Sequence, residues 1–485
     1  MRTNTSNISW RLLPLLFIVG WVCQAVGTNP DRPPAQAPCQ DQHENKTVVI
    51  RQIEFSGNHK TRHSVLSREL PISEGDTITL TQLLEQAEVS TQNLLKTTLF
   101  NFAESHIEFP DSIHADLTFS VVERWYTWPI PIVEIRERNL TDWVESPSTS
   151  KMNYGISLGV GNITGRNEQV TLLVKTGYKH SYALSYRSPW FNKSQSLLWS
   201  VETGMDMSRE SVYLTQKNKQ LTFKDNKFVE RKQYVQGSMT YRPGIDIRHR
   251  FYVGFTEYAY ADTLTMLNPR FVPGERSRFQ FMNLGYDLVI DKRDSRAYPL
   301  DGSYLVASLR RLGMGLFETE RMDVTTLQGS YRQYLGLMPR WYAGGSMMLK
   351  WSEGSTLSYF NQQGLGFANN LVRGYENYVI DAQSFVVMKA NLKYELIPQK
   401  NTHLSFIPTE KFSYIHYALY LNLFTDAGYT FDKYFYRQNP LSNKLLAGLG
   451  LGLDFVTYYD RVFRLECTMN RHGEAGVFFH VLAPF

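Results

Sequence analysis

The stretch LLAGLGLGLDF at residues 445–455 decides the fold of this chain of 485 residues. Its odd positions are all apolar, and its even positions from 448 onward hold three glycines and Asp454. This period of two is that of a β-strand with one apolar face and one polar or small face. Residues 386–396 repeat the pattern, because one face is apolar and the other carries two lysines, an asparagine and a glutamate.

Segments of this kind recur from residue 152 to the C-terminus. We count about sixteen of them, an even number as in bacterial outer-membrane barrels. A soluble sandwich also alternates, but it does not usually do so in so many long segments. Membrane barrels cross the bilayer with strands of about 9 to 11 residues whose apolar side chains face lipid. We therefore predict that residues 151–485 form a transmembrane β-barrel of about 16 antiparallel strands, closed because hydrocarbon tolerates no unpaired strand edge.

The composition agrees with a barrel and argues against several classes of function. The 29 Tyr and 28 Phe suit aromatic girdles at the two membrane boundaries. The net charge of +5 is spread without a basic block, so we expect no nucleic-acid partner. The sequence contains neither a zinc-binding His-Glu-x-x-His motif nor a nucleophile elbow. We therefore expect no enzymatic activity and no cofactor or metal.

The first 27 residues are typical of a signal peptide. Arg2 and Arg11 precede an apolar run at residues 12–22, which is too short to span a bilayer as a helix, and small residues follow it. Residues 28–45 are rich in Pro, Gln and Asp and lack periodicity, so we expect a flexible leader.

A small α+β domain is expected at residues 46–124. Alternation indicates strands and the spacing of leucines indicates helices, with turn residues Ser56, Gly57 and Asn58 after the first strand. The predicted order is strand, helix, helix, strand, strand, at residues 48–55, 63–70, 80–99, 102–109 and 113–123.

Residues 125–150 are expected to connect this domain to the barrel. Pro129, Pro131 and three tryptophans between residues 125 and 143 suit a rigid connector at a membrane–water boundary. An interdomain hinge with ordinary packing aromatics explains the composition equally well.

A long glycine-rich loop at residues 352–380 interrupts the regular strands and needs its own explanation. Arg373 lies in it between apolar residues and a glycine, which indicates a buried hairpin tip. In the strand at 419–428, leucines at 419, 421 and 423 share one face, so Asp426 lies on the luminal face. We predict a bidentate pair between Arg373 and Asp426 that holds the loop inside the barrel.

Two further expectations follow from this pair. Loss of one partner would cost about 3 kcal/mol, and less where water enters the lumen. The small luminal face formed by Gly448, Gly450 and Gly452 would let the loop backbone approach closely.

Several motifs resemble those of the outer-membrane insertase and translocase superfamily, the BamA/TamA-like group that also includes two-partner secretion transporters. They are the loop motif, the strand motif around Asp426, and residues 291–294 through 299–302. Residues 53–61 and 93–101 resemble a polypeptide-transport-associated (POTRA) domain. The resemblance implies a loop-to-barrel latch formed by Val372, Arg373, Gly374, Tyr375, Phe424, Asp426 and Gly428. A single POTRA-like domain departs from the several that BamA-type insertases typically carry.

The resemblance also implies a lateral seam between the first and last barrel strands. We expect the first strand at residues 152–163, where glycines weaken strand pairing. The last strand ends the chain and resembles the signal by which outer-membrane barrels are recognised for insertion. The expected seam residues are Gly155, Gly159, Gly161, Gly476, Phe479, Val481 and Phe485.

The function implied by the resemblance is assembly or translocation of proteins at the outer membrane of a Gram-negative bacterium. The POTRA-like domain would lie in the periplasm. The expected partners are outer-membrane lipids, unfolded outer-membrane or secreted client polypeptides, and possible periplasmic lipoprotein or chaperone partners. A secretion pore or channel, and a translocator of lipid or lipoproteins, remain alternatives.

Overall fold

The computed structural model describes residues 47–135, 152–192, 196–316, 322–367, 370–403, 414–457 and 461–482. The expected signal peptide and leader, and Phe485 of the expected seam, lie outside these ranges.

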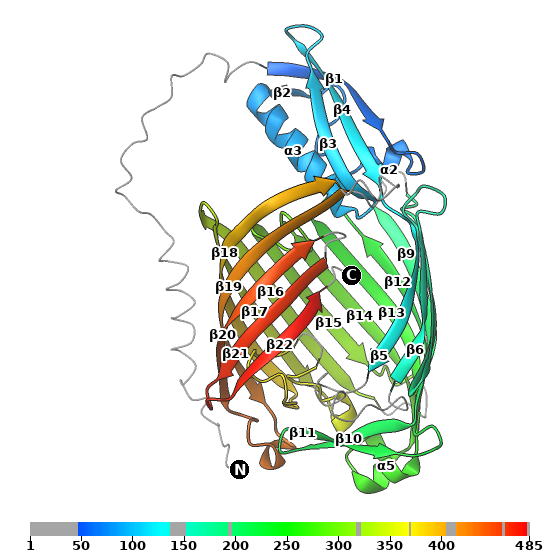
Figure 1. Ribbon diagram of the computed structural model, residues 1–485. Coiled ribbons are helices and arrows are strands. Elements are labelled where there is room, and N and C mark those ends of the chain that lie inside the picture. The colour runs from blue at the N-terminus through cyan, green and yellow to red at the C-terminus, as the bar shows by residue number, and fades with distance from the viewer. Residues whose placement is uncertain are drawn as a thin grey trace, which may run out of the picture.

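The N-terminal domain is a small sheet covered by helices (Figure 1). Its order agrees with the predicted one, except for the additional short strand β2. The elements are β1 (Thr47–Ser56), α2 (His63–Ser67), β2 (Thr77–Thr79), α3 (Leu80–Lys96), β3 (Phe100–Glu108) and β4 (His114–Glu123). The strand order is β2-β1-β4-β3, with β1 parallel to β4. A capping box between Thr79 and Gln82 fixes the start of α3, and Leu83, Ala87 and Leu94 bury its inner face.

The rest of the chain forms one curved sheet of 16 strands, each antiparallel to its neighbours, which confirms the predicted barrel architecture. Figure 1 shows this sheet curled into a cylinder below the N-terminal domain. Its strands are β5 (Thr127–Ile135), β6 (Met152–Gly161), β7 (Gln169–Gly177), β8 (Lys179–Arg187), β9 (Leu197–Ser208), β12 (Glu230–Tyr241), β13 (Ile247–Tyr260), β14 (Arg278–Asp291), β15 (Gly302–Leu312), β16 (Val324–Met338), β17 (Trp341–Glu353), β18 (Ser384–His403), β19 (Tyr414–Phe431), β20 (Leu445–Thr457), β21 (Arg461–Asn470) and β22 (Ala475–Leu482).

The predicted connector and the predicted first strand are both corrected by this topology. Thr127–Ile135 is not part of a connector, because it pairs along its whole length with β6 and is the first strand of the barrel sheet. The segment expected as first strand is therefore the second. The prolines at 129 and 131 suggested a connector, but strands at a sheet edge tolerate proline. Residues 136–151 lie outside the described ranges.

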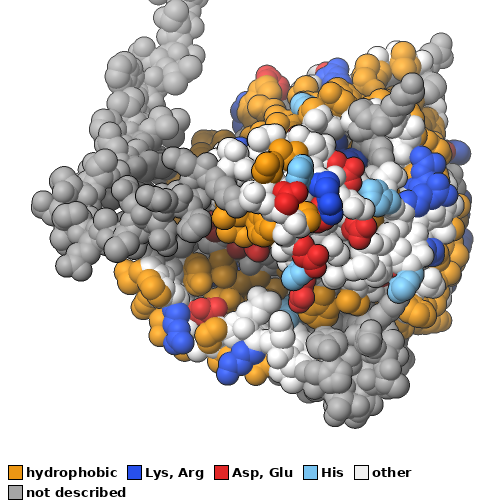
Figure 2. All heavy atoms as spheres, turned by 90° about the horizontal axis from the view of Figure 1, so that it is seen from above, with side chains coloured by type: hydrophobic (Ala, Val, Ile, Leu, Met, Phe, Trp, Pro, Cys, Tyr) orange, Lys and Arg blue, Asp and Glu red, His pale blue; other side chains and the backbone are white. Residues whose placement is uncertain are grey.

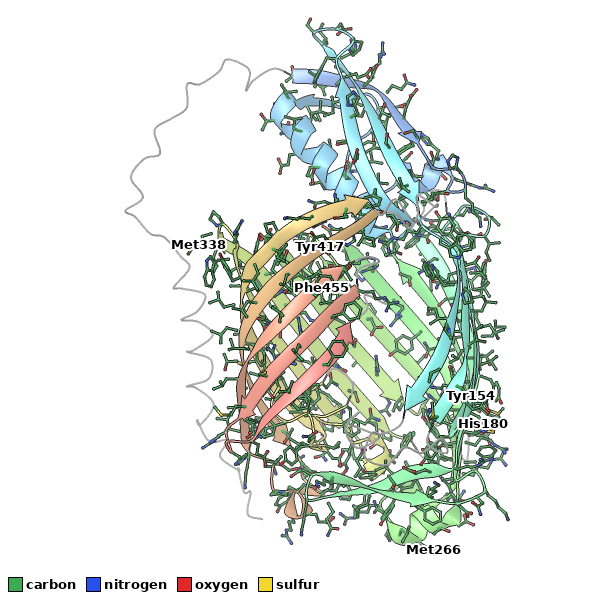
Figure 3. All side chains as sticks on the ribbon, viewed as in Figure 1. Tyr154, His180, Met266, Met338, Tyr417 and Phe455 are labelled. Atoms are coloured by element: carbon green, nitrogen blue, oxygen red, sulfur yellow. The ribbon has the colours of Figure 1, made fainter. Side chains whose placement is uncertain are left out.

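The alternation of side chains along the strands produces an apolar outer wall. In β20, the odd-numbered leucines are about half exposed, whereas Asp454 and the glycines at 448, 450 and 452 are buried. Tyr154 and Met338 point outward on opposite sides of the barrel (Figure 3). Seen from above, hydrophobic side chains lie around the rim of the molecule, and charged ones gather on the N-terminal domain in the centre of the view (Figure 2). None of the described helices is long and apolar enough to cross a membrane.

The barrel end distant from the N-terminal domain is covered by a cap of short elements (Figure 1). They are β10 (Glu210–Gln216), β11 (Lys219–Lys224), α5 (Asp262–Leu267), η2 (Pro273–Glu275), η3 (Tyr359–Asn361) and η4 (Tyr436–Gln438). Tyr260, Leu264, Phe271, Phe279 and Phe435 form an aromatic-rich core beneath the cap. Such burial holds the connecting segments over the barrel opening.

The POTRA-like domain is attached directly to the near end of the barrel. Arg242, in the β12–β13 turn, donates two hydrogen bonds of 2.8 Å to the carboxylate of Glu69, and both side chains are largely buried. Asn162 in the β6–β7 turn donates to the hydroxyl of Thr61 at 2.9 Å. The domain therefore has a defined position over the barrel.

Candidate functional site

The loop between β17 and β18 folds back to the barrel wall and places Arg373 against β19. The guanidinium donates to both carboxylate oxygens of Asp426, with Nε–Oδ2 at 2.9 Å and Nη2–Oδ1 at 2.5 Å. The backbone N–H of Arg373 also donates to Oδ2, at 3.0 Å. The side chain of Arg373 is 7% exposed and that of Asp426 is fully buried. The geometry of the predicted bidentate pair is thus present.

Three more side chains surround this pair. Glu466 on β21 lies 3.5 Å from Nη1 of Arg373, and Lys389 on β18 lies 3.9 Å from Oδ2 of Asp426. The Arg373 guanidinium also stacks 3.7 Å above the ring centroid of Phe424, a cation–π contact. Two cations and two carboxylates therefore share one buried cluster, which offsets the cost of burying each charge.

Glycines let the loop backbone approach the wall, as predicted for Gly448, whereas Gly450 and Gly452, named in the same prediction, lie nearest to atoms of the wall strands. A Cβ added at Gly448 would overlap the carbonyl oxygen of Arg373, and one added at Gly428 would lie 2.5 Å from Cγ2 of Val372. Gly374 has a φ of +92°, a conformation that favours glycine. Only small residues at these positions allow the latch to close.

Apolar packing adds to the charged contacts of the latch. Val372 and Tyr375 are buried in one cluster with Leu365, Ile380 and Phe385 from the loop and from β18. The loop is therefore held in place by this apolar cluster as well as by the ion pair of Arg373.

The loop is also bonded to the turn that precedes the last strand. The hydroxyl of Tyr378 donates to Glu474 at 2.8 Å, and the side-chain amide of Asn470 donates to the carbonyl of Gly374 at 3.0 Å. On β22 itself, His480 lies 3.4 Å from Glu466. These contacts connect the latch to β22 and so to one side of the seam.

The expected seam residues that the structure describes lie in two strands. Gly155, Gly159 and Gly161 lie in β6, which is paired on both sides and is not an edge strand. Gly476 and Phe479 lie in the edge strand β22, and the Phe479 side chain is exposed on the outer face. Val481 belongs to the same strand. Among the described residues, no ladder joins β22 to β5, so these two strands are the edges of the sheet. The sequence led us to expect a closed ladder, and between these two strands this expectation is not met in the described part of the chain.

The tip of the β10–β11 hairpin closes the distant end of the barrel, a feature that the alternation pattern did not reveal. Asn218 is 1% exposed and bonds to both neighbouring loops. Its backbone N–H donates to Asn439 at 2.9 Å, and its side chain donates to the carbonyl of Val379 at 3.3 Å. Nearby, burial and the neighbouring Asp432 raise the pKa of Asp381 to about 7.

A second inward contact comes from the opposite end. The β14–β15 turn sends Tyr298 across to β20, where its hydroxyl donates to Asp454 at 2.7 Å. Arg464 donates to both oxygens of Asp454 at 2.7 and 2.9 Å, and Lys393 lies 3.9 Å from the ring centroid of Tyr298. Asp454 therefore anchors a turn, a role that its place opposite the leucines of β20 did not indicate.

Sequence reasoning also missed Glu466, Lys389 and the Tyr378–Glu474 contact. The alternation of side chains along each strand could have indicated them, because Glu466 and Lys389 occupy luminal positions of their strands. Charges on a luminal face find partners there, but alternation alone does not say which strand lies opposite which loop.

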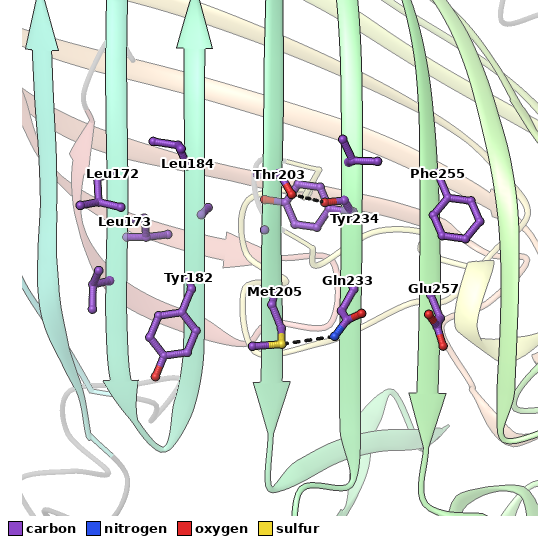
Figure 4. Close-up of a pocket in the computed structure, with 14 residues that line it drawn as sticks. Leu172, Leu173, Tyr182, Leu184, Thr203, Met205, Gln233, Tyr234, Phe255 and Glu257 are labelled. Carbon is purple, nitrogen blue, oxygen red and sulfur yellow. Dashed lines mark hydrogen bonds between the residues drawn. The ribbon is translucent and has the colours of Figure 1, made fainter.

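A hollow on the barrel wall does not contain a comparable cluster of charges. A shallow hollow of about 590 Å³ lies over β7, β8, β9, β12 and β13 (Figure 4). Leu172, Leu184 and Phe255 line it together with a single carboxylate, Glu257, which bonds to Arg278. Within the described ranges, no group of three or more His, Cys, Asp or Glu side chains is arranged to hold a metal ion.

Comparisons with solved structures agree with this architecture. The chain is similar to BamA from Haemophilus ducreyi lacking POTRA domains 1–3, with a TM-score of 0.50, 14% identity and coverage of 90% of this chain and 85% of that one. It is similar to CdiB from Escherichia coli with a TM-score of 0.53, 13% identity and coverage of 90% and 76%. At these identities the likeness concerns the fold. No curated protein sequence matches the chain significantly.

Family models match both parts of the chain. The model for the surface antigen variable number repeat, a POTRA domain, matches residues 48–124. The model for the Omp85 superfamily domain matches residues 162–457, which is more than half of the chain. This match implies an outer-membrane barrel with its POTRA domain in the periplasm, and a general role in insertion or translocation. The chain belongs to the Omp85 superfamily.

Proposed function

We propose that this protein inserts client polypeptides into the outer membrane through the seam between β5 and β22. One observation carries the proposal: the barrel sheet has two edge strands that are not hydrogen-bonded to each other in the described chain. An unpaired edge in hydrocarbon is costly, and an added strand satisfies it. A client strand that pairs there is placed directly beside the lipid.

Contacts made by inward-reaching segments at both ends of the barrel support insertion over export. At the distant end, the hairpin tip at Asn218 and the loop carrying Arg373 are bonded to each other and to the wall. At the periplasmic end, Tyr298 reaches across to Asp454. A chain threaded through the lumen would have to break all of these contacts, whereas a strand added at the seam breaks none of them.

The POTRA domain would receive clients or periplasmic partners such as a lipoprotein or a chaperone. Its strands β2 and β3 are the edges of the small sheet. Such edges accept an extended segment by strand addition. Because the sequence carries no nucleotide-binding motif, the folding of the client itself supplies the free energy for insertion.

Covalent closure of the seam tests the proposal. The three native cysteines, Cys23, Cys39 and Cys467, are first replaced by serine. Val133→Cys on β5 and Val477→Cys on β22 are then joined with a bifunctional thiol reagent. Both valines are 67% exposed on the outer face. In proteoliposomes, the linked protein should no longer assemble an unfolded outer-membrane barrel, as followed by the electrophoretic shift of the folded client.

The matched control links two strands that are already neighbours. Val253 on β13 and Leu284 on β14 face each other in the ladder, so a link between Val253→Cys and Leu284→Cys should leave activity unchanged. Full activity of the protein linked across β5 and β22 would refute lateral insertion. If secretion of a client into the vesicle continued instead, the protein would be an export pore.

A further inference from the structure

The two edges of the seam differ in the hydrogen bonds that they offer. The N–H of Gly161 donates to the carbonyl of Tyr126 at 2.8 Å, in register with the β5–β6 ladder. In an antiparallel ladder, alternate residues bond to the same neighbour. The even-numbered residues of β5 therefore bond to β6, and the backbone groups that point to the open edge belong to residues 127, 129, 131, 133 and 135.

Two of these five positions are Pro129 and Pro131. Proline has no N–H, so the open edge of β5 lacks donors at two successive bonding positions. A strand placed against β5 would leave two of its own carbonyls without partners. In hydrocarbon this loss is not repaired by water.

The open edge of β22 is complete. The N–H of Asn470 donates to the carbonyl of Glu474, so the even-numbered residues of β22 bond to β21. The groups that point to the open edge belong to Ala475, Val477, Phe479 and Val481, and each of them carries both a donor and an acceptor. The side chains of Val477 and Phe479 are 67% and 64% exposed.

The β22 edge is also held in place before any strand arrives. His480 contacts Glu466 of the latch cluster, and Glu474 accepts a hydrogen bond from Tyr378 of the loop. Pre-organisation of one partner reduces the entropy that binding must overcome.

We propose that β22, and not β5, is the edge on which an incoming client strand pairs. This inference rests on the proposed function and names the acceptor within it. The occupant is an extended client segment antiparallel to β22, with alternating apolar side chains that continue the outer face of Val477 and Phe479. The prolines of β5 keep the seam from pairing fully with itself and direct the client to the other edge.

Disulfide trapping tests this assignment in the full chain with its three cysteines, Cys23, Cys39 and Cys467, replaced by serine. Val477→Cys and Val133→Cys are compared one at a time, since the two valines are equally exposed on the two edges. The probe is a small urea-unfolded outer-membrane barrel protein with single cysteines along its terminal strands. Adducts through position 477 should exceed those through position 133 by about tenfold or more, the ratio expected from two missing backbone hydrogen bonds.

A second variant separates the prolines from other differences between the edges. In Pro129→Val/Pro131→Val, the donors of β5 are restored, and adducts through position 133 should rise toward those through position 477. An unchanged ratio would overturn the inference, as would equal trapping at both edges with the prolines present. Disulfide-linked pairs of this chain through position 477, in preference to client adducts, would assign the edge to a second copy instead.

The outcomes also distinguish this inference from the proposed function. Equal trapping at both edges refutes the choice of β22 but leaves lateral insertion standing. Assembly of the client without trapping at either edge refutes the seam as the route, and with it both proposals.

Discussion

Removal of Arg373 tests the latch most directly. In Arg373→Ala, the loop loses both hydrogen bonds from the guanidinium to Asp426, the contact with Glu466 and the stack on Phe424. Asp426 and Glu466 remain on the wall with side chains that are 0% and 2% exposed. We expect the loop to leave the wall because these carboxylates then need water.

The size of the effect follows from burial. Breaking a buried ion pair by removing one partner costs about 3 to 5 kcal/mol. Lys389, 3.9 Å from Asp426, compensates part of this loss, so we expect about 2 to 4 kcal/mol. In Arg373→Ala/Asp426→Asn, the carboxylate of Asp426 is also removed, so fewer buried charges are left without a partner. The two changes together should therefore cost about 1 to 3 kcal/mol less than the sum of the single changes.

The assay combines unfolding by denaturant with limited proteolysis of the loop and conductance in planar bilayers. Arg373→Ala should lower the unfolding midpoint, expose residues 370–380 to protease and increase conductance. Arg250→Ala is the matched control, because Arg250 pairs with Asp287 at 2.5 Å between two strands without touching the loop. Asp287 is only 5% exposed, so Arg250→Ala should also lower the unfolding midpoint, but it should leave the loop protected from protease.

Two results would refute this reasoning. One is an intact, protease-resistant loop in Arg373→Ala. The other is strict additivity of the Arg373 and Asp426 changes, within about 0.5 kcal/mol, because residues in one charged cluster should show coupling.

Three further predictions concern the approach of the loop, the docking of the POTRA domain and the cap. Gly448→Val should release the loop with all charges intact, because its side chain overlaps the Arg373 carbonyl, and proteolysis should show this. Glu69→Ala should loosen the POTRA domain by about 2 kcal/mol, because Arg242 loses a buried partner, and spin-label distances between domain and barrel should broaden. The raised pKa of Asp381, about 7, means that the cap is most stable while this carboxyl is protonated, so stability should fall as pH rises from about 4 to about 7. Asp381→Asn should abolish this dependence in hydrogen exchange of the β10–β11 hairpin, after correction for intrinsic rates.

Each of these predictions has a control or a contrary outcome. Gly329→Ala lies in a strand with open space around the added Cβ and should leave the loop protected. Unchanged spin-label distances in Glu69→Ala would mean that other contacts fix the POTRA domain. An unchanged pH profile in Asp381→Asn would show that Asp381 is not the source of the dependence.

The sequence predicted what depends on local periodicity. Alternation identified the barrel, and parity in the strand at 419–428 placed Asp426 on the luminal side, where Arg373 meets it. Periodicity failed at β5, because Pro129 and Pro131 resemble a connector unless the neighbouring strand is known. It also failed for Glu466 and Tyr298, since their partners depend on which strands a loop crosses, and side-chain alternation contains no such information.

In the interactions described above, the loop contacts the β22 side of the seam and not the β5 side. The latch is therefore connected to one edge of the seam. Arg373 binds β19 and lies beside β21, Tyr378 binds the turn before β22, and Glu466 touches both Arg373 and His480. Displacement of the loop therefore removes support from the edge that offers a full set of donors. In contrast, β5 is tied to β6 and to the POTRA side of the barrel. A change at Arg373 should thus reduce client trapping at β22 before it changes β5, because the contacts that would transmit it end on β22.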